Sequence, residues 1–316
     1  MQMKKKYTVI GAAILDILAG PVDQTVFTTG SCPMDFTRLS FGGDALNEAV
    51  VLSRLGEDVD LISLVGADEA GKRVLSFAQE NGIRTEHIQQ RQGLETGVNI
   101  VLVDGEGERH FLTNPHSSLR KLSVEDILPF TDEMGDIVSF ASIFVSPALD
   151  IPSMERLFRS IRQKPGRILA ADFTKAKNGE TLQDIAPLLP CIDYALPNES
   201  ELALLTGKED PAENVRRMLE CGASCVILKQ GKKGCLVGLN SREIIPVRAY
   251  PTDHAVDSTG AGDSFAAGFL WGLSHLPSPL EAARFGCAVA SCAVEGIGAA
   301  GNILSLEEPL RRYHLL

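Results

Sequence analysis

Short apolar segments alternate with segments of helical periodicity along most of this 316-residue chain. The apolar runs typical of buried strands lie at residues 7–10, 61–65, 137–145, 168–171, 194–196 and 225–228. The patterns typical of helices lie at residues 45–55, 71–79, 154–161, 212–219, 264–273, 280–294 and 306–313. Because strand–helix alternation favours parallel strands with helices on both faces, the sequence predicts a three-layer α/β/α sandwich with a mostly parallel central sheet.

Two stretches interrupt this alternation. Residues 12–40 show no helical pattern, and residues 96–113 are typical of a hairpin with its turn at Asp104–Gly107. We expect a small separate β-sheet, formed by about 12–40 and 96–117, that acts as a lid over the functional site of a single domain spanning 1–316. The alternative is that both stretches are edge strands of the main sheet.

The composition argues against a nucleic-acid-binding, disulfide-rich or membrane-spanning protein. Hydrophobic residues make up 44% of the chain, and 41 acidic against 30 basic residues give a net charge of −11, which argues against nucleic acid as a partner. The seven cysteines are scattered without a Cys-x-x-Cys motif, so we expect reduced thiols rather than disulfides or a zinc site. No run of 18 apolar residues occurs, and the sequence therefore predicts no membrane partner and a cytoplasmic location.

The segment Asp257-Ser-Thr-Gly-Ala-Gly-Asp263 directly precedes a helical pattern. Backbone N–H groups of Gly260, Ala261 and Gly262 at a helix start would form a cradle for phosphate. A carboxylate beside such a cradle suits a general base that takes a proton from a hydroxyl attacking the phosphate, which points to Asp263. The alternative is a capped turn, since Asp is a common N-cap residue.

A second glycine turn, Gly42-Gly43, leads into the helical pattern at 45–55. Two glycines permit close approach of a ligand to the backbone, and Asn47, one turn later, has a side chain that suits a polyol. Asp16 follows the first strand, at the sheet edge where open α/β sheets bind ligands. Alternatively, Asp16 caps a turn and Asn47 is a solvated helix residue.

Two further segments follow predicted strands. Asn198 and Glu201 have the spacing of a helix cap, which we favour, although the pair could also hold a hydrated Mg²⁺ through waters. Lys229, Gly231 and Gly234 could border a nucleotide or form an ordinary β-turn. They are not a P-loop, because no Gly-Lys-Ser/Thr follows.

Taken together, these segments resemble the ribokinase-like carbohydrate kinases of the PfkB family over nearly the whole chain. The resemblance rests on Gly11…Asp16, Gly42-Gly43…Asn47, Val65-Gly66-Ala67-Asp68…Gly71, Asn198…Glu201, Gly231…Gly234 and Asp257…Asp263, the last being the most specific. It implies ATP-dependent transfer of a phosphoryl group to a hydroxyl of a small sugar or sugar derivative, with Mg²⁺ as cofactor. Rival hypotheses are a nucleoside kinase of the same fold and a catalytically idle sugar-binding protein.

The resemblance also implies a role for each site residue. Asp263 would be the base and the amides of Gly260, Ala261 and Gly262 the phosphoryl cradle. The acceptor would be held by Asp16, Gly42, Gly43, Asn47, Asn99 and Arg109. The nucleotide site would include Asn198, Lys229, Gly231 and Gly234, with Glu201 organising Mg²⁺. A monovalent cation, K⁺, would be held by Asp257, Thr259, Val294, Ile297, Gly298 and Asn302.

Some residues depart from the family pattern. Lys229 stands where many members have Thr, and no acid stands near Val145-Ser146, where ribokinase has a Glu that contacts ribose. We expect a neutral acceptor rather than a sugar phosphate, because the lid contributes only Arg38 and Arg109 as cations. Arg109 is expected at a hairpin edge facing solvent. We also expect a homodimer formed through the lid.

Overall fold

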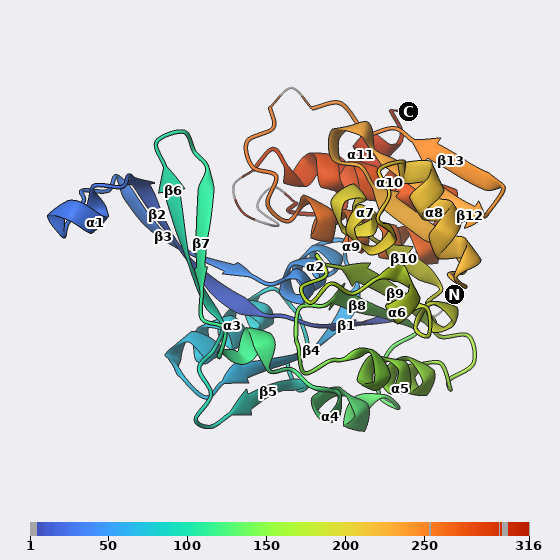
Figure 1. Ribbon diagram of the computed structural model, residues 1–316, viewed down its shortest axis with the longest axis horizontal. Coiled ribbons are helices and arrows are strands. Elements are labelled where there is room, and N and C mark those ends of the chain that lie inside the picture. The colour runs from blue at the N-terminus through green and yellow to red at the C-terminus, as the bar shows by residue number, and fades with distance from the viewer. Residues whose placement is uncertain (1–4, 253, 297, 299–302, 316) are drawn as a thin grey trace.

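The structure, a computed structural model, describes residues 5–252, 254–296, 298 and 303–315. Ile297 and Asn302, two predicted cation ligands, therefore lie outside the described residues. The described strands form one large sheet and one small sheet, and the helices pack mainly against the large one (Figure 1).

The large sheet has nine strands in the order β13-β12-β11-β10-β9-β8-β1-β4-β5. Their bounds are β1 Lys6–Ile10, β4 Asp58–Gly66, β5 Ile88–Arg91, β8 Ile137–Ile143, β9 Ile168–Phe173, β10 Tyr194–Leu196, β11 Val226–Lys229, β12 Cys235–Asn240 and β13 Glu243–Val247. Pairing is parallel from β5 to β11 and antiparallel among β11, β12 and β13. The predicted mostly parallel sheet is confirmed.

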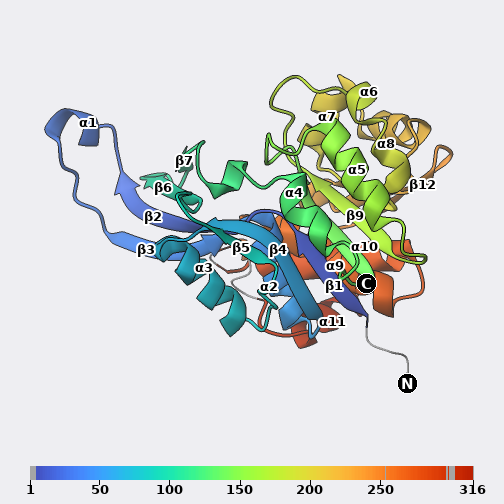
Figure 2. The same cartoon turned by 90° about the horizontal axis from the view of Figure 1, so that it is seen from below.

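The large sheet is covered on both faces, which explains its continuous apolar runs. Every residue of β4 from Val59 to Gly66 is buried, as expected for a strand between two helix layers. One layer packs into the core cluster that contains α2 Asp44–Arg54, α3 Glu69–Glu80, α9 Ala261–His275, α10 Pro279–Ala293 and α11 Glu307–Tyr313. The opposite layer contains α4 Val124–Ile127, α5 Ile151–Ile161, α6 Leu182–Ile185, α7 Glu199–Thr206 and α8 Pro211–Glu220. Figure 2 shows the two layers on either side of the sheet, which confirms the three-layer sandwich.

The small sheet projects from the body as an arm (Figures 1 and 2). Its order is β3-β2-β6-β7, with bounds β2 Ile14–Val22, β3 Phe36–Gly42, β6 Val98–Asp104 and β7 Arg109–Thr113. The predicted hairpin turn is present, because the N–H of Gly107 donates to the carbonyl of Asp104 at 3.1 Å. A separate small sheet is thus confirmed, whereas the alternative of extra edge strands on the main sheet is wrong.

Two features of the fold differ from the sequence analysis. The tip of the arm carries a one-turn helix, α1 Val26–Thr29, in a segment without helical periodicity. Strands β5, β12 and β13 were not predicted. β13 lies at the sheet edge, where only Val247 is buried and Pro246 is tolerated, so its sequence lacks a continuous apolar run. None of the described helices is long and apolar enough to cross a membrane.

Candidate active site

The predicted phosphate cradle, Gly260 to Gly262, lies at the start of helix α9. Gly260 precedes the helix in the left-handed conformation, with φ 71°, which glycine adopts without steric cost. The N–H of Ala261 donates to the carbonyl of Ser258 at 3.2 Å, so this amide is engaged within the turn. Gly262 lies inside the first helical turn, where N–H groups have no partner within the helix. A Cβ added to Gly262 would lie 3.5 Å from Nζ of Lys229, which places that ammonium group beside the cradle.

Asp263 lies in the first turn of α9 and accepts a hydrogen bond of 2.7 Å from Nδ2 of Asn47 on α2. Burial first, and then the carboxylate of Asp44, raises the pKa of Asp263 to about 8, against the opposing effects of Asn47 and Lys229. A carboxylate with such a pKa is a stronger proton acceptor than an ordinary one. The structure thus brings together two residues 216 positions apart that the sequence analysis had assigned to one reaction.

A cavity of about 390 Å³ opens in front of Asp263, between the body and the small sheet. Across that sheet, Nδ2 of Asn99 donates to Asp16 at 2.9 Å, and the Thr113 hydroxyl donates to Oδ1 of Asn99 at 2.7 Å. The predicted acceptor residues that line the cavity are Asp16, Gly42, Gly43, Asn47, Asn99 and Arg109. The cavity therefore presents carboxylate and amide groups to a ligand, as hydroxyl recognition requires.

Steric constraints explain why glycine occupies positions 42 and 43 at the cavity wall. A Cβ on Gly42 would lie 2.4 Å from Oδ2 of Asp16, so a larger residue would displace that carboxylate. Gly43 has φ 94°, and a Cβ there would lie 2.4 Å from the carbonyl oxygen of Ala12. Both positions thus require glycine in order to keep Asp16 and α2 in place.

Two cationic residues that no sequence pattern indicated also line this cavity, Arg120 and Lys177. The Arg120 guanidinium donates to the carbonyl of Val145 at 2.5 Å, and Lys177 is an exposed side chain at the rim. Partial burial, followed by repulsion from Arg120, lowers the pKa of Lys177. Neither side chain forms an ion pair with a described residue. Arg120 ends a short 3-10 helix, Ser118–Arg120, and Lys177 lies in a loop. Neither segment contains a recognisable motif, so no local signal pointed to them.

Arg109 does not face solvent, contrary to the expectation from its place in the hairpin. Its Nη2 lies 2.7 Å from Oδ2 of Asp257, and its Nη1 lies 2.5 Å from the Thr259 hydroxyl. Asp257, Thr259 and Gly298 are close together, as the cation-loop hypothesis required, but Asp257 already has a cationic partner. The Val294 carbonyl likewise accepts two backbone N–H groups.

A second cavity, of about 610 Å³, lies on the other side of the cradle. It brings together all the predicted nucleotide residues, Asn198, Lys229, Gly231 and Gly234, with Gly262 at the same wall. Gly234 has φ 102°, and a Cβ there would lie 2.0 Å from the Val247 carbonyl, so the turn requires glycine.

Asn198 and Glu201 form a capping box, the interpretation favoured from the sequence. Oδ1 of Asn198 accepts the N–H of Glu201 at 2.9 Å, and Oε2 of Glu201 accepts the N–H of Asn198 at 2.8 Å. Burial raises the pKa of Glu201 to about 7. Capping therefore uses side-chain oxygens of Asn198 and Glu201 that would hold a hydrated Mg²⁺ in the alternative interpretation.

Lys229 forms a buried ion pair with Asp172 of β9. Burial alone would lower the pKa of Lys229, but Asp172 and Glu201 more than compensate and raise it. The ammonium group is therefore a positive charge held beside Gly262, in the wall of the larger cavity. This environment gives a physical role to the residue that departs from the family pattern.

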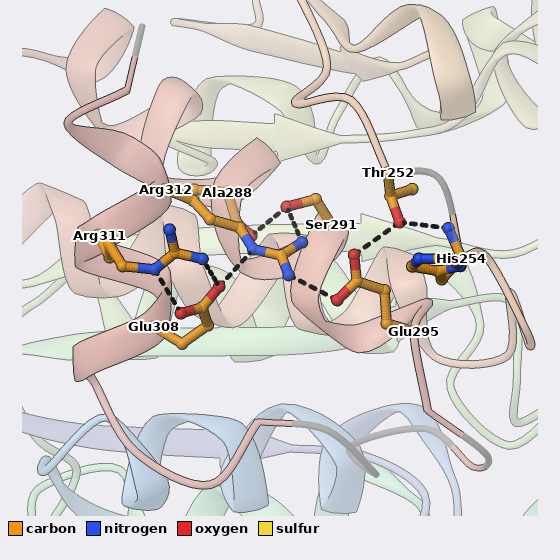
Figure 3. A network of polar contacts seen from close by, with 8 residues as sticks. All are labelled: Thr252, His254, Ala288, Ser291, Glu295, Glu308, Arg311 and Arg312. Carbon is orange, nitrogen blue, oxygen red and sulfur yellow. Dashed lines mark hydrogen bonds and ion pairs between the residues drawn. The ribbon is translucent and has the colours of Figure 1, made fainter.

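One wall of the larger cavity is held by a polar network shown in Figure 3. Arg312 of α11 pairs with Oε2 of Glu295 at 2.5 Å and donates to the Ser291 hydroxyl at 3.1 Å. Glu295 in turn accepts the Thr252 hydroxyl at 2.7 Å. Because Ser291 and Thr252 line the cavity, this network links the C-terminal helix to the predicted nucleotide site.

Comparison with known proteins agrees with this geometry. Residues 4–305 match the pfkB family of carbohydrate kinases. A protein of Archaeoglobus fulgidus named as an uncharacterized sugar kinase is 31% identical over 78% of this chain and 96% of its own. The 2-dehydro-3-deoxygluconokinase of Dickeya dadantii is 28% identical over 82% of this chain and 89% of its own.

The fold has a close counterpart among solved structures. Arabidopsis thaliana ribokinase, in complex with ribose and ATP, superposes with a TM-score of 0.82 at 23% identity, covering 98% of this chain and 99% of that one. At this identity the likeness concerns the fold alone. The match over residues 4–305 covers nearly the whole sequence, so the chain belongs to the pfkB family of carbohydrate kinases and is an ATP-dependent sugar kinase.

Proposed function

We propose that the enzyme transfers the γ-phosphoryl group of ATP, bound with Mg²⁺ in the larger cavity, to a hydroxyl in the smaller one. Asp263 accepts the hydroxyl proton, the oxygen bonds to the γ-phosphorus, and the bond to the departing ADP breaks. The observation that carries this proposal is the shared wall between the cavities. Gly260 and Asp263 line the smaller cavity, and Gly262 and Lys229 line the larger one.

Bound Mg²⁺ would neutralise charge on the phosphate oxygens. Phosphates and waters usually supply most ligands of such an ion, so the enzyme does not need a dedicated cluster of carboxylates. Among the described residues, no group of three or more His, Cys, Asp or Glu side chains is arranged to hold a metal. This supports a metal that enters with ATP.

We propose further that the acceptor is a sugar acid. Arg120 and Lys177 supply two positive charges at the cavity and have no described ion-pair partner, while Asp16 and Asn99 suit hydroxyl groups. A guanidinium and an ammonium group both bind a carboxylate through charge-assisted hydrogen bonds. The Dickeya relative is named for a gluconate derivative, which supports the same class. The sequence-based expectation of a neutral acceptor counted only the cations of the lid, Arg38 and Arg109, and did not include Arg120 and Lys177.

A substrate panel tests this class of acceptor. Sugar acids should give a higher kcat/KM than the matched neutral sugars and sugar phosphates. Arg120→Met and Lys177→Met should each raise KM for the acid about 10–100-fold, the loss expected for a charge-assisted hydrogen bond, with little effect on neutral sugars. Lys175→Met is the control, because Lys175 is exposed nearby but does not line this cavity. Equal loss for acids and neutral sugars would contradict the carboxylate site, and preference for phosphates would reassign it.

We propose that two copies associate through the small sheet. On its face away from the cavity, Leu39, Ile100 and Leu112 are 54%, 43% and 54% exposed, and the strand register places them in one row. Such an apolar row in water favours burial against a partner. Light scattering should therefore report a dimer, and Leu112→Glu should yield a monomer; a wild-type monomer at micromolar concentration would contradict the proposal.

The cytoplasm is the proposed location. All seven cysteines are free, as expected in a reducing compartment. ATP, the proposed phosphoryl donor, is also available there.

A further inference from the structure

Arg109 crosses from the small sheet to the loop that precedes the phosphate cradle. It lies on β7, and its guanidinium contacts Asp257 and Thr259, 148 and 150 positions later in the chain. The Arg109 side chain is 25% exposed and that of Asp257 only 6% exposed. This ion pair is therefore well shielded from water, where exposed pairs contribute little.

The carboxylate of Asp257 is fully engaged by the protein. Besides Arg109, it accepts the N–H of Gly298 at 2.9 Å and the N–H of Thr259 at 3.0 Å. Asp257 is thus surrounded by hydrogen-bond donors close to the predicted phosphate cradle.

The described members of the predicted potassium loop do not fit a bound cation in this arrangement. Asp257 is paired with a guanidinium, and the Thr259 hydroxyl accepts from the same group. The carbonyl of Val294 accepts the N–H groups of Val256 at 2.7 Å and Asp257 at 3.1 Å, which occupies both of its lone pairs. Among the described residues, the Asp257 carboxylate, the Thr259 hydroxyl and the Val294 carbonyl are therefore already engaged by groups of the protein.

We propose that Arg109 is the built-in cation of the phosphoryl-transfer site, so that its guanidinium neutralises Asp257 in place of K⁺. The inference rests on the proposed function, because the charge matters only if phosphate is transferred at this cradle. Arg109 lies on the same sheet as Asp16 and Asn99, so one sheet carries both the positive charge and the predicted acceptor-binding groups. A guanidinium is always protonated, and its positive charge therefore does not depend on pH or salt composition.

The test compares three variants in tetramethylammonium buffer and in the same buffer with K⁺ replacing it at equal ionic strength. Arg109→Met removes the charge, and Arg109→Lys retains it. Arg38→Met is the matched control, because Arg38 is an exposed arginine of the same sheet that stacks on Phe36. The readouts are the midpoint of thermal unfolding, which requires no activity, and kcat and KM for ATP.

Wild type and Arg38→Met should show no response to K⁺ in either readout. Arg109→Met should lose about 10²-fold in kcat without K⁺, the cost of removing one group that stabilises charge in the transition state. Added K⁺ should then raise its unfolding midpoint and restore part of kcat, because the ion binds the vacated carboxylate. Arg109→Lys should retain most of the activity and show no K⁺ response.

Two results would overturn the inference. One is a wild-type enzyme that K⁺ stabilises and activates, which needs no variant to detect. The other is an Arg109→Met enzyme whose only change is a higher KM for the acceptor, because Arg109 would then be an acceptor ligand. If no acceptor is phosphorylated at all, the proposed function fails, but the unfolding midpoints still decide whether K⁺ binds only when Arg109 is absent.

Discussion

Asp263→Asn should lower kcat by about 10²–10⁴, the contribution expected of a general base, while ATP binding and the fold remain intact. Asn keeps the size of the side chain and can still contact Asn47. It cannot accept the proton of the acceptor hydroxyl. Single-turnover kinetics with saturating ATP should therefore show a slower chemical step rather than weaker binding.

The pH dependence of this variant has a defined sign. Because the pKa of Asp263 is raised to about 8, wild-type kcat/KM should rise with pH up to about 8, and the variant should lack this rise. In the folded state Asp263 holds its proton between its ordinary pKa and 8, so its contribution to the free energy of unfolding falls as pH rises through that window. Asp263→Asn should therefore be at least as stable as wild type, most clearly above pH 8.

Asp184→Asn provides the control for Asp263→Asn. Asp184 also lies in the first turn of a helix, but it is exposed and lines neither cavity. This control should leave kcat unchanged. If Asp263→Asn retains wild-type turnover on the true acceptor, the residue is a helix-capping group and not the base.

Lys229→Met should cause the second large effect, on both stability and catalysis. Removing one partner of the buried Lys229–Asp172 pair leaves a carboxylate without compensation, which costs about 3–5 kcal/mol at pH values where Asp172 is ionised. Burial already raises the pKa of Asp172 to about 6, against the attraction of Lys229. Without Lys229, Asp172 should bind a proton at higher pH, so the stability difference should grow as pH rises.

The double variant Asp172→Asn/Lys229→Met separates structure from catalysis. It removes both charges and should recover most of the unfolding free energy lost in Lys229→Met. Activity should stay low, because the cradle still lacks the ammonium group that lies next to Gly262. Lys233→Met is the control, since Lys233 pairs at the surface with Glu199. If the double variant regains wild-type kcat along with stability, Lys229 has only a structural role.

The conformation at the start of α9 could be predicted from the neighbouring residues in the sequence. Gly260 adopts a left-handed conformation and Asp263 follows in the first helical turn, as the order of glycines, aspartate and apolar residues indicated. The parallel sheet was predictable for the same reason, because a strand buried on both faces, such as β4, must be continuously apolar. Each of these features depends on residues that are close together in the sequence.

The electrostatic arrangement of the site was not predictable in this way. Lys229 was assigned to the nucleotide, but its pairing with Asp172 joins two strands 57 positions apart. Arg109 was expected in solvent, because a hairpin edge is usually exposed and nothing nearby in the sequence points to Asp257. Arg120 and Lys177 lie in segments without a motif, and only their common cavity relates them to the proposed acceptor.

The sequence by itself therefore determined the layers, the small sheet and the glycine turn at the start of α9, because periodicity and glycine conformation are local properties. It also led to the proposals of a phosphate cradle at that turn and of Asp263 as the base. The tertiary structure alone decided which charges face each other, and with them the proposed acceptor class and the partner of Asp257. Coulomb interactions depend on distance in space and on burial, and neither quantity follows from the spacing of residues along the chain.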